Sequence, residues 1–273
     1  MKPLTEQYIK SIFKPRSANT HKGSHGHSLL IAGQKMMMGG AVIAAKACLR
    51  AGTGLLTVNI PEDERFILQT SIPEAMLCNR NDTKIDFEKY NAIGIGPALG
   101  IDNEQLLVNV CKNVRCNIDI DADALNMLAN NKSLLDILPP NTILTPHPKE
   151  FDRIFGTHTS HESRIETAIE KAKQLKIIIV LKDAKTIITS GNETFINTTG
   201  NAGLAKGGSG DALTGIITAL LAQNYSPFEA AQLGVYIHGL AADICLKNDQ
   251  STESMLITDV IEYLGNVFKS LYS

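Results

Sequence analysis

The segment Asn197-Thr198-Thr199-Gly200-Asn201-Ala202-Gly203-Leu204-Ala205-Lys206-Gly207-Gly208-Ser209-Gly210-Asp211 is followed directly by the apolar stretch 212–221, which has the character of a helix. Glycine lets the backbone turn so that several N–H groups converge on one point. The N-terminus of a helix adds partial positive charge at that point. The segment therefore predicts a loop that binds an anion at the start of a helix.

Asp211 ends this loop and falls in the first turn of the predicted helix. A carboxylate beside an anion site does not favour anion binding alone, but it can deprotonate a hydroxyl group that attacks a phosphoryl group. The alternative is a simple tight turn, with Asp211 stabilising the first helical turn through the helix dipole. The cluster of small residues with a lysine favours phosphoryl transfer.

Outward from this loop, the sequence predicts a parallel sheet. A strand over 28–33, a helix over 41–50 and a strand over 55–61 form one strand–helix–strand unit, which implies a right-handed crossover. Further strands are expected near 91–96, 117–121, 141–145 and 177–181, and a hairpin over 187–196 that turns at Gly191-Asn192. Further helices are expected over 5–13, 103–113, 162–175, 227–246 and 257–271, with one more after Asp123. We expect one α/β domain over residues 1–273.

The composition narrows the function classes. The formal net charge is -2, which gives no electrostatic reason to expect binding to nucleic acid or to an anionic membrane. The N-terminus lacks a signal-peptide core, and no apolar run is long enough to span a bilayer. The five cysteines include no Cys-x-x-Cys pair, which is typical of reduced thiols in a cytoplasmic protein.

Three groups of polar residues are candidate ligands. His21, His25 and His27 are compatible with metal binding, but no carboxylate or cysteine accompanies them, which favours a solvated loop. Asp121 and Asp123 follow a predicted strand, at the edge where α/β folds bind ligands, and we expect only one of them in the site. The histidine of Pro146-His147-Pro148 is held extended at the end of a strand, which favours ligand contact.

Taken together, these residues resemble the NAD(P)H-hydrate dehydratase family of the ribokinase-like superfamily. The segment 205–211 is similar to the Gly-x-Gly-Asp signature of that superfamily. Further stretches carry the resemblance and occur in the family's order: 22–26, 39–41, 49–54, 121–126, 145–150 and 197–211. The most specific of them are Thr145-Pro146-His147-Pro148 and the N-terminal Lys22-Gly23 segment. The resemblance implies a three-layer sandwich with a mostly parallel central sheet and helices on both faces.

The family's reaction repairs (6S)-NADHX and NADPHX, which are NADH and NADPH with a hydroxyl group on the reduced ring. The resemblance implies that ADP or ATP phosphorylates this hydroxyl, with Mg²⁺ as the expected metal, and that phosphate then leaves. It also implies a cytoplasmic homotetramer, and the length leaves no room for an additional epimerase domain.

The resemblance assigns roles by position. Asp211 would be the base, and the N–H groups of Gly208, Ser209 and Gly210 would stabilise the transferring phosphoryl group. Substrate contacts would come from Ala41, Gly100, His147 and Asp211, and nucleotide contacts from Lys182, Asp183, Ala184, Lys185, Thr186 and Gly210. Asn197 and Asn201 would help to order the phosphate and magnesium region.

One departure from the family concerns the nucleotide loop, where Lys182-Asp183 replaces the usual Lys-Gly. Two other functions stay open at this point: a ribokinase-like kinase for a vitamin precursor or sugar, and a nucleotide-binding regulator without catalysis.

Overall fold

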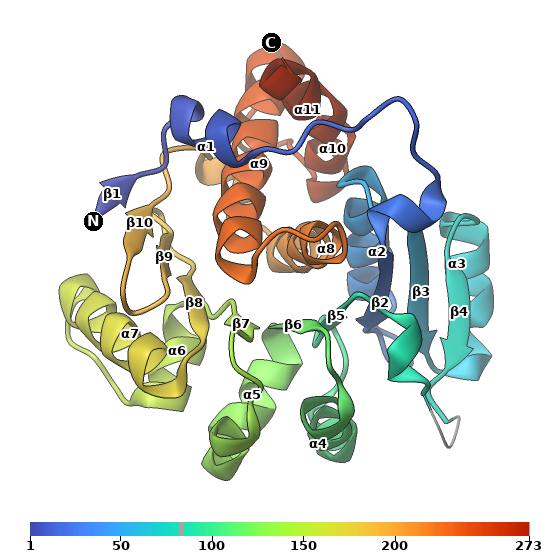
Figure 1. The fold of residues 1–273 in the computed structure, drawn as a ribbon, viewed down its shortest axis with the longest axis horizontal. Helices are drawn as coiled ribbons and strands as arrows, with labels where there is room; N and C mark the ends of the chain where they lie inside the picture. Colours follow the sequence, from blue (N-terminus) through green and yellow to red (C-terminus); the bar gives the residue numbers. More distant parts are fainter. Residues whose placement is uncertain (82–84, 273) are drawn as a thin grey trace.

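The computed structural model describes residues 1–81 and 85–272 and contains one ten-stranded sheet (Figure 1). The strand order is β1-β10-β9-β8-β7-β6-β5-β2-β3-β4, and all neighbours are parallel except β8–β9 and β9–β10. The strands are β1 (Lys2–Pro3), β2 (His27–Ile31), β3 (Leu55–Ile60), β4 (Met76–Asn79), β5 (Ala92–Ile95), β6 (Asn117–Ile120), β7 (Ile143–Leu144), β8 (Ile178–Leu181), β9 (Ile187–Thr189) and β10 (Thr194–Ile196).

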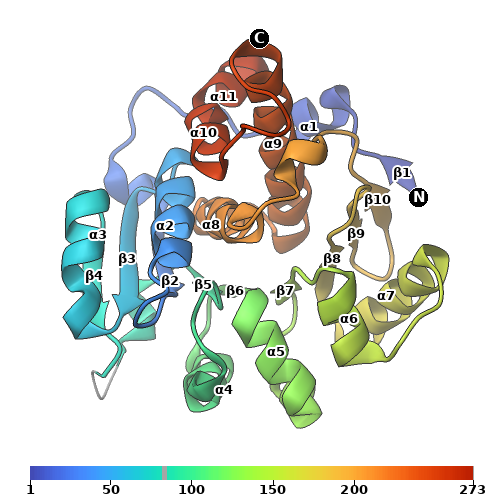
Figure 2. The same ribbon diagram turned by 180° about the vertical axis from the view of Figure 1, so that it is seen from behind.

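Helices cover both faces of the sheet, as Figures 1 and 2 show from opposite sides. One hydrophobic core joins the sheet to α1 (Glu6–Ile12), α2 (Gly39–Arg50), α3 (Arg65–Ser71), α8 (Ser209–Ala222), α9 (Pro227–Asn248), α10 (Ile257–Glu262) and α11 (Leu264–Tyr272). The second core, on the other face, includes α4 (Glu104–Asn113), α5 (Ala122–Asn130), α6 (Pro148–Phe155) and α7 (His161–Leu175). The predicted three-layer α/β architecture is confirmed. It explains why β8 is buried along its whole length, since apolar helices cover it on both sides.

Some elements differ from the sequence-based expectation. The helix expected over 257–271 is two helices, α10 and α11, separated at Tyr263. Helix α6 begins directly at Pro148, where no helix was predicted, because proline is accepted at the first helical position. The short strand β1 pairs with β10 through a contact between residues far apart in sequence, which no local pattern indicates.

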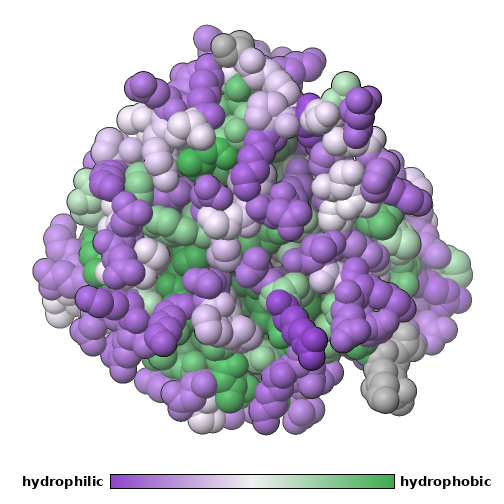
Figure 3. All heavy atoms as spheres, viewed as in Figure 1, coloured by the Kyte–Doolittle hydropathy of each residue, from purple (hydrophilic) through white to green (hydrophobic). Residues whose placement is uncertain are grey.

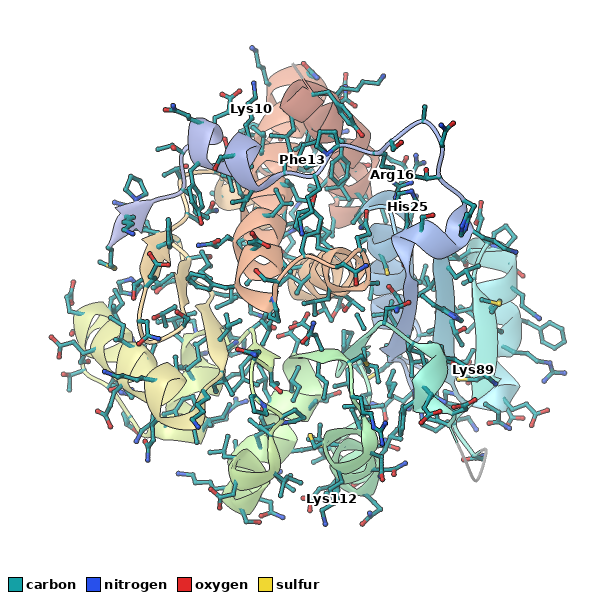
Figure 4. All side chains as sticks on the ribbon, in the orientation of Figure 1. Lys10, Phe13, Arg16, His25, Lys89 and Lys112 are labelled. Atoms are coloured by element: carbon teal, nitrogen blue, oxygen red, sulfur yellow. The ribbon has the colours of Figure 1, made fainter. Side chains whose placement is uncertain are left out.

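The N-terminal segment crosses from the sheet edge to the C-terminal helices before it reaches β2 (Figure 1). Phe13 and Arg16 mark this crossing in Figure 4. The Phe13 ring stacks on Phe268 with 6.1 Å between centroids, and the Arg16 backbone N–H donates to the Tyr272 hydroxyl at 3.0 Å. Both ends of the chain are thereby fixed against each other.

Figure 3 shows hydrophilic residues over most of one face, with hydrophobic residues in small groups between them. Within residues 1–81 and 85–272, no helix has the length and apolarity needed to cross a membrane.

Helices α2 and α8 pack with their backbones in close contact. A Cβ at Gly215 of α8 would lie 2.1 Å from the carbonyl oxygen of Ala44 in α2, which is far inside contact distance. A glycine is therefore required at this crossing, and the crossing sets how the starts of the two helices face each other.

We expect Gly215→Ala to destabilise the protein even though alanine is the better helix former. Overpacking a rigid contact costs about 1–3 kcal/mol, whereas alanine gains only about 0.5–1 kcal/mol over glycine in a helix interior. Urea unfolding measures the difference in the free energy of unfolding.

Gly265→Ala in α11 is the matched control, because no atom lies within 4 Å of a Cβ placed there. The control variant should be as stable as the parent or slightly more stable. Equal stability of the two variants would contradict the role assigned to the crossing.

Candidate active site

The candidate site lies at the carboxyl ends of four neighbouring parallel strands. Strands β5, β6, β7 and β8 lead respectively into the Gly96–Gly100 loop, Asp121, the segment before His147, and Lys182. Chains that leave adjacent parallel strands emerge at one edge of the sheet, where α/β folds bind ligands. Residues far apart in sequence thus meet at this edge.

The predicted anion loop leads into α8 as expected. Gly208 precedes the helix with φ of 93°, a left-handed conformation that favours glycine. The backbone N–H of Ser209 donates to the Lys206 carbonyl at 3.4 Å. Among the residues described, no acceptor faces the N–H groups of Gly208 and Gly210, so both can donate to a bound anion.

Asp211 lies between the starts of α8 and α2. A Cβ at Gly40 would be 3.2 Å from its Oδ2 atom and 2.9 Å from the Cβ of Ala98, so glycine is needed for this approach. Burial and the negative charge of Asp121 raise the pKa of Asp211 to about 6, although Lys182 lowers it. A carboxylate with this pKa can exchange a proton near neutral pH.

A buried ion pair lies beside the loop. Lys182 Nζ is 2.7 Å from Asp121 Oδ1, and Thr214 Oγ1 of α8 donates to Asp121 Oδ2 at 3.0 Å. A Cβ at Gly210 would be 3.1 Å from both Lys182 Nζ and Asp121 Oδ2. Burial lowers the pKa of Lys182, but the Asp121 and Glu150 carboxylates outweigh it and raise the pKa overall. The ammonium group is therefore charged and faces the anion loop.

Residues Lys182–Thr186 form the connection between β8 and β9, as the sequence predicted. Asp183 closes its own turn: its Oδ1 accepts the Ala184 N–H at 2.7 Å, and its carbonyl accepts the Thr186 hydroxyl at 3.3 Å. The His161 ring nitrogen Nδ1 is 3.1 Å from Asp183 Oδ2. Asp183 thus stabilises this turn through its own side chain and carbonyl group.

His147 is the N-cap residue of α6, a role that its display between prolines did not indicate. Its Nδ1 atom accepts the backbone N–H groups of Lys149 and Glu150 at 3.1 and 3.2 Å. Burial and the nearby Lys182 charge lower the pKa of His147. An acceptor Nδ1 in a neutral imidazole leaves the hydrogen on Nε2, so His147 is a hydrogen-bond donor at Nε2.

Glu150 completes the same cap and was missed by the sequence analysis. Its Oε2 atom accepts the His147 backbone N–H at 2.8 Å, and its Oε1 atom is 3.4 Å from His147 Nε2. A Glu three residues after the N-cap is a recognisable capping pattern. Burial raises the pKa of Glu150, whereas the Lys182 charge lowers it.

The two acidic residues after β6 make different contacts: Asp121 pairs with Lys182, whereas Asp123 contacts the loop after β5. Asp123 Oδ2 accepts the backbone N–H of Gly100 at 2.8 Å and so shapes the loop after β5. The side chain of Ala41 is completely buried, and a Cβ at Gly33 would be 2.9 Å from it. The whole Ala41 residue, backbone included, is buried, so it presents no exposed atom to a ligand in this structure.

The two asparagines of the loop are already hydrogen-bonded inside the protein. Asn197 Nδ2 donates to the Thr199 carbonyl at 2.8 Å. Asn201 Nδ2 donates to Asp243 at 3.0 Å, and its Oδ1 accepts the Gly203 N–H at 3.0 Å. Their amides therefore shape the loop backbone.

Two other features lie outside this arrangement. His21 accepts the Gly23 N–H, and His27 Nε2 is 2.8 Å from Thr57 Oγ1, while the described residues contain no cluster of three acidic, histidine or cysteine side chains suited to a metal. Asp119 of β6 is fully buried, and neither carboxyl oxygen has a partner among the described residues. Burial and Asp121 raise its pKa well above the usual range, which favours the uncharged acid.

Known proteins are similar to this chain over nearly its whole length. A family model described as NAD(P)H-hydrate dehydratase matches residues 28–266. The ADP-dependent (S)-NAD(P)H-hydrate dehydratase of Bacillus subtilis is 34% identical, covering 97% of both chains. The bifunctional NAD(P)H-hydrate repair enzyme of Moorella thermoacetica is 33% identical over 98% of this chain, which spans about half (54%) of that relative's length.

Solved structures of similar proteins have the same fold. The ADP/ATP-dependent NAD(P)H-hydrate dehydratase from Bacillus subtilis, co-crystallised with ATP and Mg²⁺, superposes with a TM-score of 0.89 at 33% identity, covering 99% and 98% of the two chains. A ribokinase-like superfamily protein from Enterococcus faecalis gives a TM-score of 0.89 at 29% identity, covering 99% and 96%. The ribokinase-like fold is thus confirmed, and the chain belongs to the NAD(P)H-hydrate dehydratase family.

Proposed function

We propose that this protein uses ADP or ATP to dehydrate (6S)-NADHX and NADPHX back to NADH and NADPH. The observation that carries the proposal is the partly buried Asp211 carboxylate, which has a pKa of about 6 and lies at the end of a glycine-rich loop with unbonded N–H groups. Family membership supplies the substrate class.

The chemistry explains why a dehydratase would use a phosphoryl donor. Hydroxide is a poor leaving group and phosphate is a good one. The substrate hydroxyl loses its proton, its oxygen attacks the terminal phosphorus of the nucleotide, and the bond to the rest of the nucleotide breaks. The C–O bond then breaks with loss of phosphate, and a proton leaves the neighbouring ring carbon, which restores the double bond.

Asp211 is the proposed base for the first step. Its ionised form predominates above pH about 6, where it can accept the hydroxyl proton. The close approach permitted by Gly40 would leave the substrate hydroxyl between α2 and α8. Gly100, which is partly exposed, would then contact the dinucleotide through its backbone, whereas contact with the fully buried Ala41 would require its neighbours to move.

The transferring phosphoryl group would be bound by the N–H groups of Gly208, Ser209 and Gly210 together with the Lys182 ammonium. Lys182 supports this role because its Nζ atom already lies against Gly210. The ion pair between Lys182 and Asp121 would weaken when the Lys182 ammonium binds a phosphate oxygen. The backbone of Lys182–Thr186 would contact the nucleotide on the same side.

Mg²⁺ fits this site as an ion held mainly by nucleotide phosphates. The described residues offer no preformed cage of three acidic or histidine ligands, and Mg²⁺ commonly binds through phosphates with one or two carboxylates. Asp121 and Asp211 are the carboxylates near enough to the anion loop to serve. The ion would neutralise charge on the phosphates.

The family resemblance also supports a single domain that works as a cytoplasmic homotetramer. Light scattering coupled to size-exclusion chromatography tests the oligomeric state directly.

The decisive assay follows the absorbance of the reduced nicotinamide while purified hydrate is incubated with ADP or with ATP. The proposal requires recovery of that absorbance together with stoichiometric free phosphate. A stable phosphorylated product without recovery would indicate a small-molecule kinase instead.

We expect Asp211→Asn to lower kcat by about 10²–10⁴-fold, because the variant lacks the base. Nucleotide affinity, measured by calorimetry, should change little. In the parent protein, kcat/KM should fall as the pH drops below about 6, since protonation of Asp211 removes its capacity to accept a proton. Unchanged turnover in the variant would refute the assignment.

Two substitutions of His147 separate the role of its Nδ1 atom as the helix cap from the role of its Nε2–H as a donor. His147→Asn keeps an acceptor suited to an N-cap but removes the Nε2–H donor, so stability should be retained while KM for the hydrate rises about tenfold, as expected for one lost hydrogen bond. His147→Gln carries a donor closer to the Nε2 position and weakens the cap. His147→Gln should therefore have a lower KM for the hydrate than His147→Asn, but it should unfold at a lower urea concentration than His147→Asn. The reverse pattern would contradict the assignment of the hydrogen to Nε2.

A further inference from the structure

Helix α9 contacts the segment that leads into the anion loop. Thr199 Oγ1 donates to the Tyr236 carbonyl of α9 at 2.8 Å. A Cβ at Gly239 would be 2.4 Å from the same hydroxyl oxygen, so the segment rests directly on the helix backbone.

Asp243 extends this contact by one further turn of α9. Its Oδ2 atom accepts the backbone N–H of Gly200 at 2.8 Å, and its Oδ1 atom accepts Asn201 Nδ2 at 3.0 Å. Tyr236, Gly239 and Asp243 are spaced by three and four residues, so they share one face of the helix. The carboxylate thus holds two adjacent residues of the loop at once.

The restraint continues toward the anion site. Asn201 Oδ1 accepts the Gly203 N–H at 3.0 Å, so the orientation fixed by Asp243 also fixes the next turn. Lys206 then donates to the carbonyl groups of Glu253 and Met255 after α9, the latter at 2.8 Å. The loop is therefore tied at two points to the C-terminal part of the chain before it reaches Gly208.

An ion pair does not explain this carboxylate. Asp243 has no salt bridge to any described residue, and its hydrogen-bond donors are the loop groups of Gly200 and Asn201. A partly buried carboxylate with two aligned donors forms strong, charge-assisted hydrogen bonds. Its placement serves the loop rather than the stability of α9 itself.

We propose that Asp243 is a positioning residue that holds the anion loop in the geometry needed for phosphoryl transfer. Its kinetic consequence rests on the proposed function; its structural consequence does not. Asp243 acts through Asn201 and Gly200 and touches neither nucleotide nor substrate.

The first measurement is amide hydrogen exchange of the ligand-free protein, followed on peptides that cover residues 200–211. Asp243→Asn replaces one carboxylate oxygen by a donor that faces another donor. Exchange in this region should therefore become faster. Asp249→Asn is the matched control: it makes the same chemical change in an exposed residue at the end of α9, whose side chain accepts the Tyr263 hydroxyl instead.

The second measurement is steady-state kinetics. Asp243→Asn should lower kcat about ten- to a hundredfold, the scale expected when reacting groups are misplaced by about 1 Å, with nucleotide dissociation constants changed less than threefold. Asn201→Ala removes the loop side of the same contact and leaves α9 unchanged. This variant replaces Asp243→Asn in both measurements if Asp243→Asn folds poorly.

A double-mutant cycle separates positioning from general stability. If Asp243 acts through Asn201, the Asn201→Ala/Asp243→Asn protein should lose little more kcat than the worse single variant. The inference would be overturned if the kcat losses of the two single variants multiplied in the double variant. It would also be overturned if Asp243→Asn kept both the kcat of the parent protein and its rate of amide exchange over residues 200–211. If the parent protein does not dehydrate the hydrate, the proposed function fails, and the exchange measurement alone decides whether Asp243 holds the loop.

Discussion

The ion pair between Asp121 and Lys182 is the interaction on which the site depends. It joins the ends of β6 and β8 at 2.7 Å, and both groups lie against Gly210 at the start of α8. Removing one partner of a buried pair commonly costs about 3–5 kcal/mol, because the other charge is left without compensation. The pair also sets its neighbours: Asp121 raises the pKa of Asp211, and Lys182 lowers the pKa values of Asp211 and His147. One contact thereby fixes both geometry and charge.

Helix packing determines where the proposed base lies. Gly215 lets α8 approach the backbone of α2, and Gly40 lets Asp211 approach the start of α2. These two glycines act through the absence of a side chain, which allows the close approach of α8 to α2 that places Asp211. A third glycine, Gly239 of α9, lets the segment that leads into the anion loop contact the helix backbone at Thr199. Close backbone packing on one face of the sheet is therefore the basis of the site.

Much of the site was predictable because its chemistry is concentrated in short segments. Gly208, Gly210 and Asp211 occur in one run, and the strands preceding Asp121 and Lys182 have clear hydrophobic patterns. Other parts depended on contacts between distant residues. Asn201 looks like a phosphate or metal residue in sequence, yet its amide joins Asp243 to Gly203. The sequence around His147 predicts a ligand contact, and the structure shows that its Nδ1 atom also caps α6. The two flanking prolines gave no indication of this helix.

The sequence by itself determined the α/β class, the mostly parallel character of the sheet and the glycine-rich loop that leads through Asp211 into a helix, since each follows from local periodicity and from residues adjacent in the chain. Only the tertiary structure decided that Lys182 lies against the anion loop, that Asp121 pairs with Lys182 while Asp123 binds the Gly100 N–H, and that Asp211 has a pKa of about 6. Those properties arise from burial and from charges that distant segments bring together. No short stretch of sequence contains them, because electrostatic environment and backbone approach are set by the packing of the whole chain.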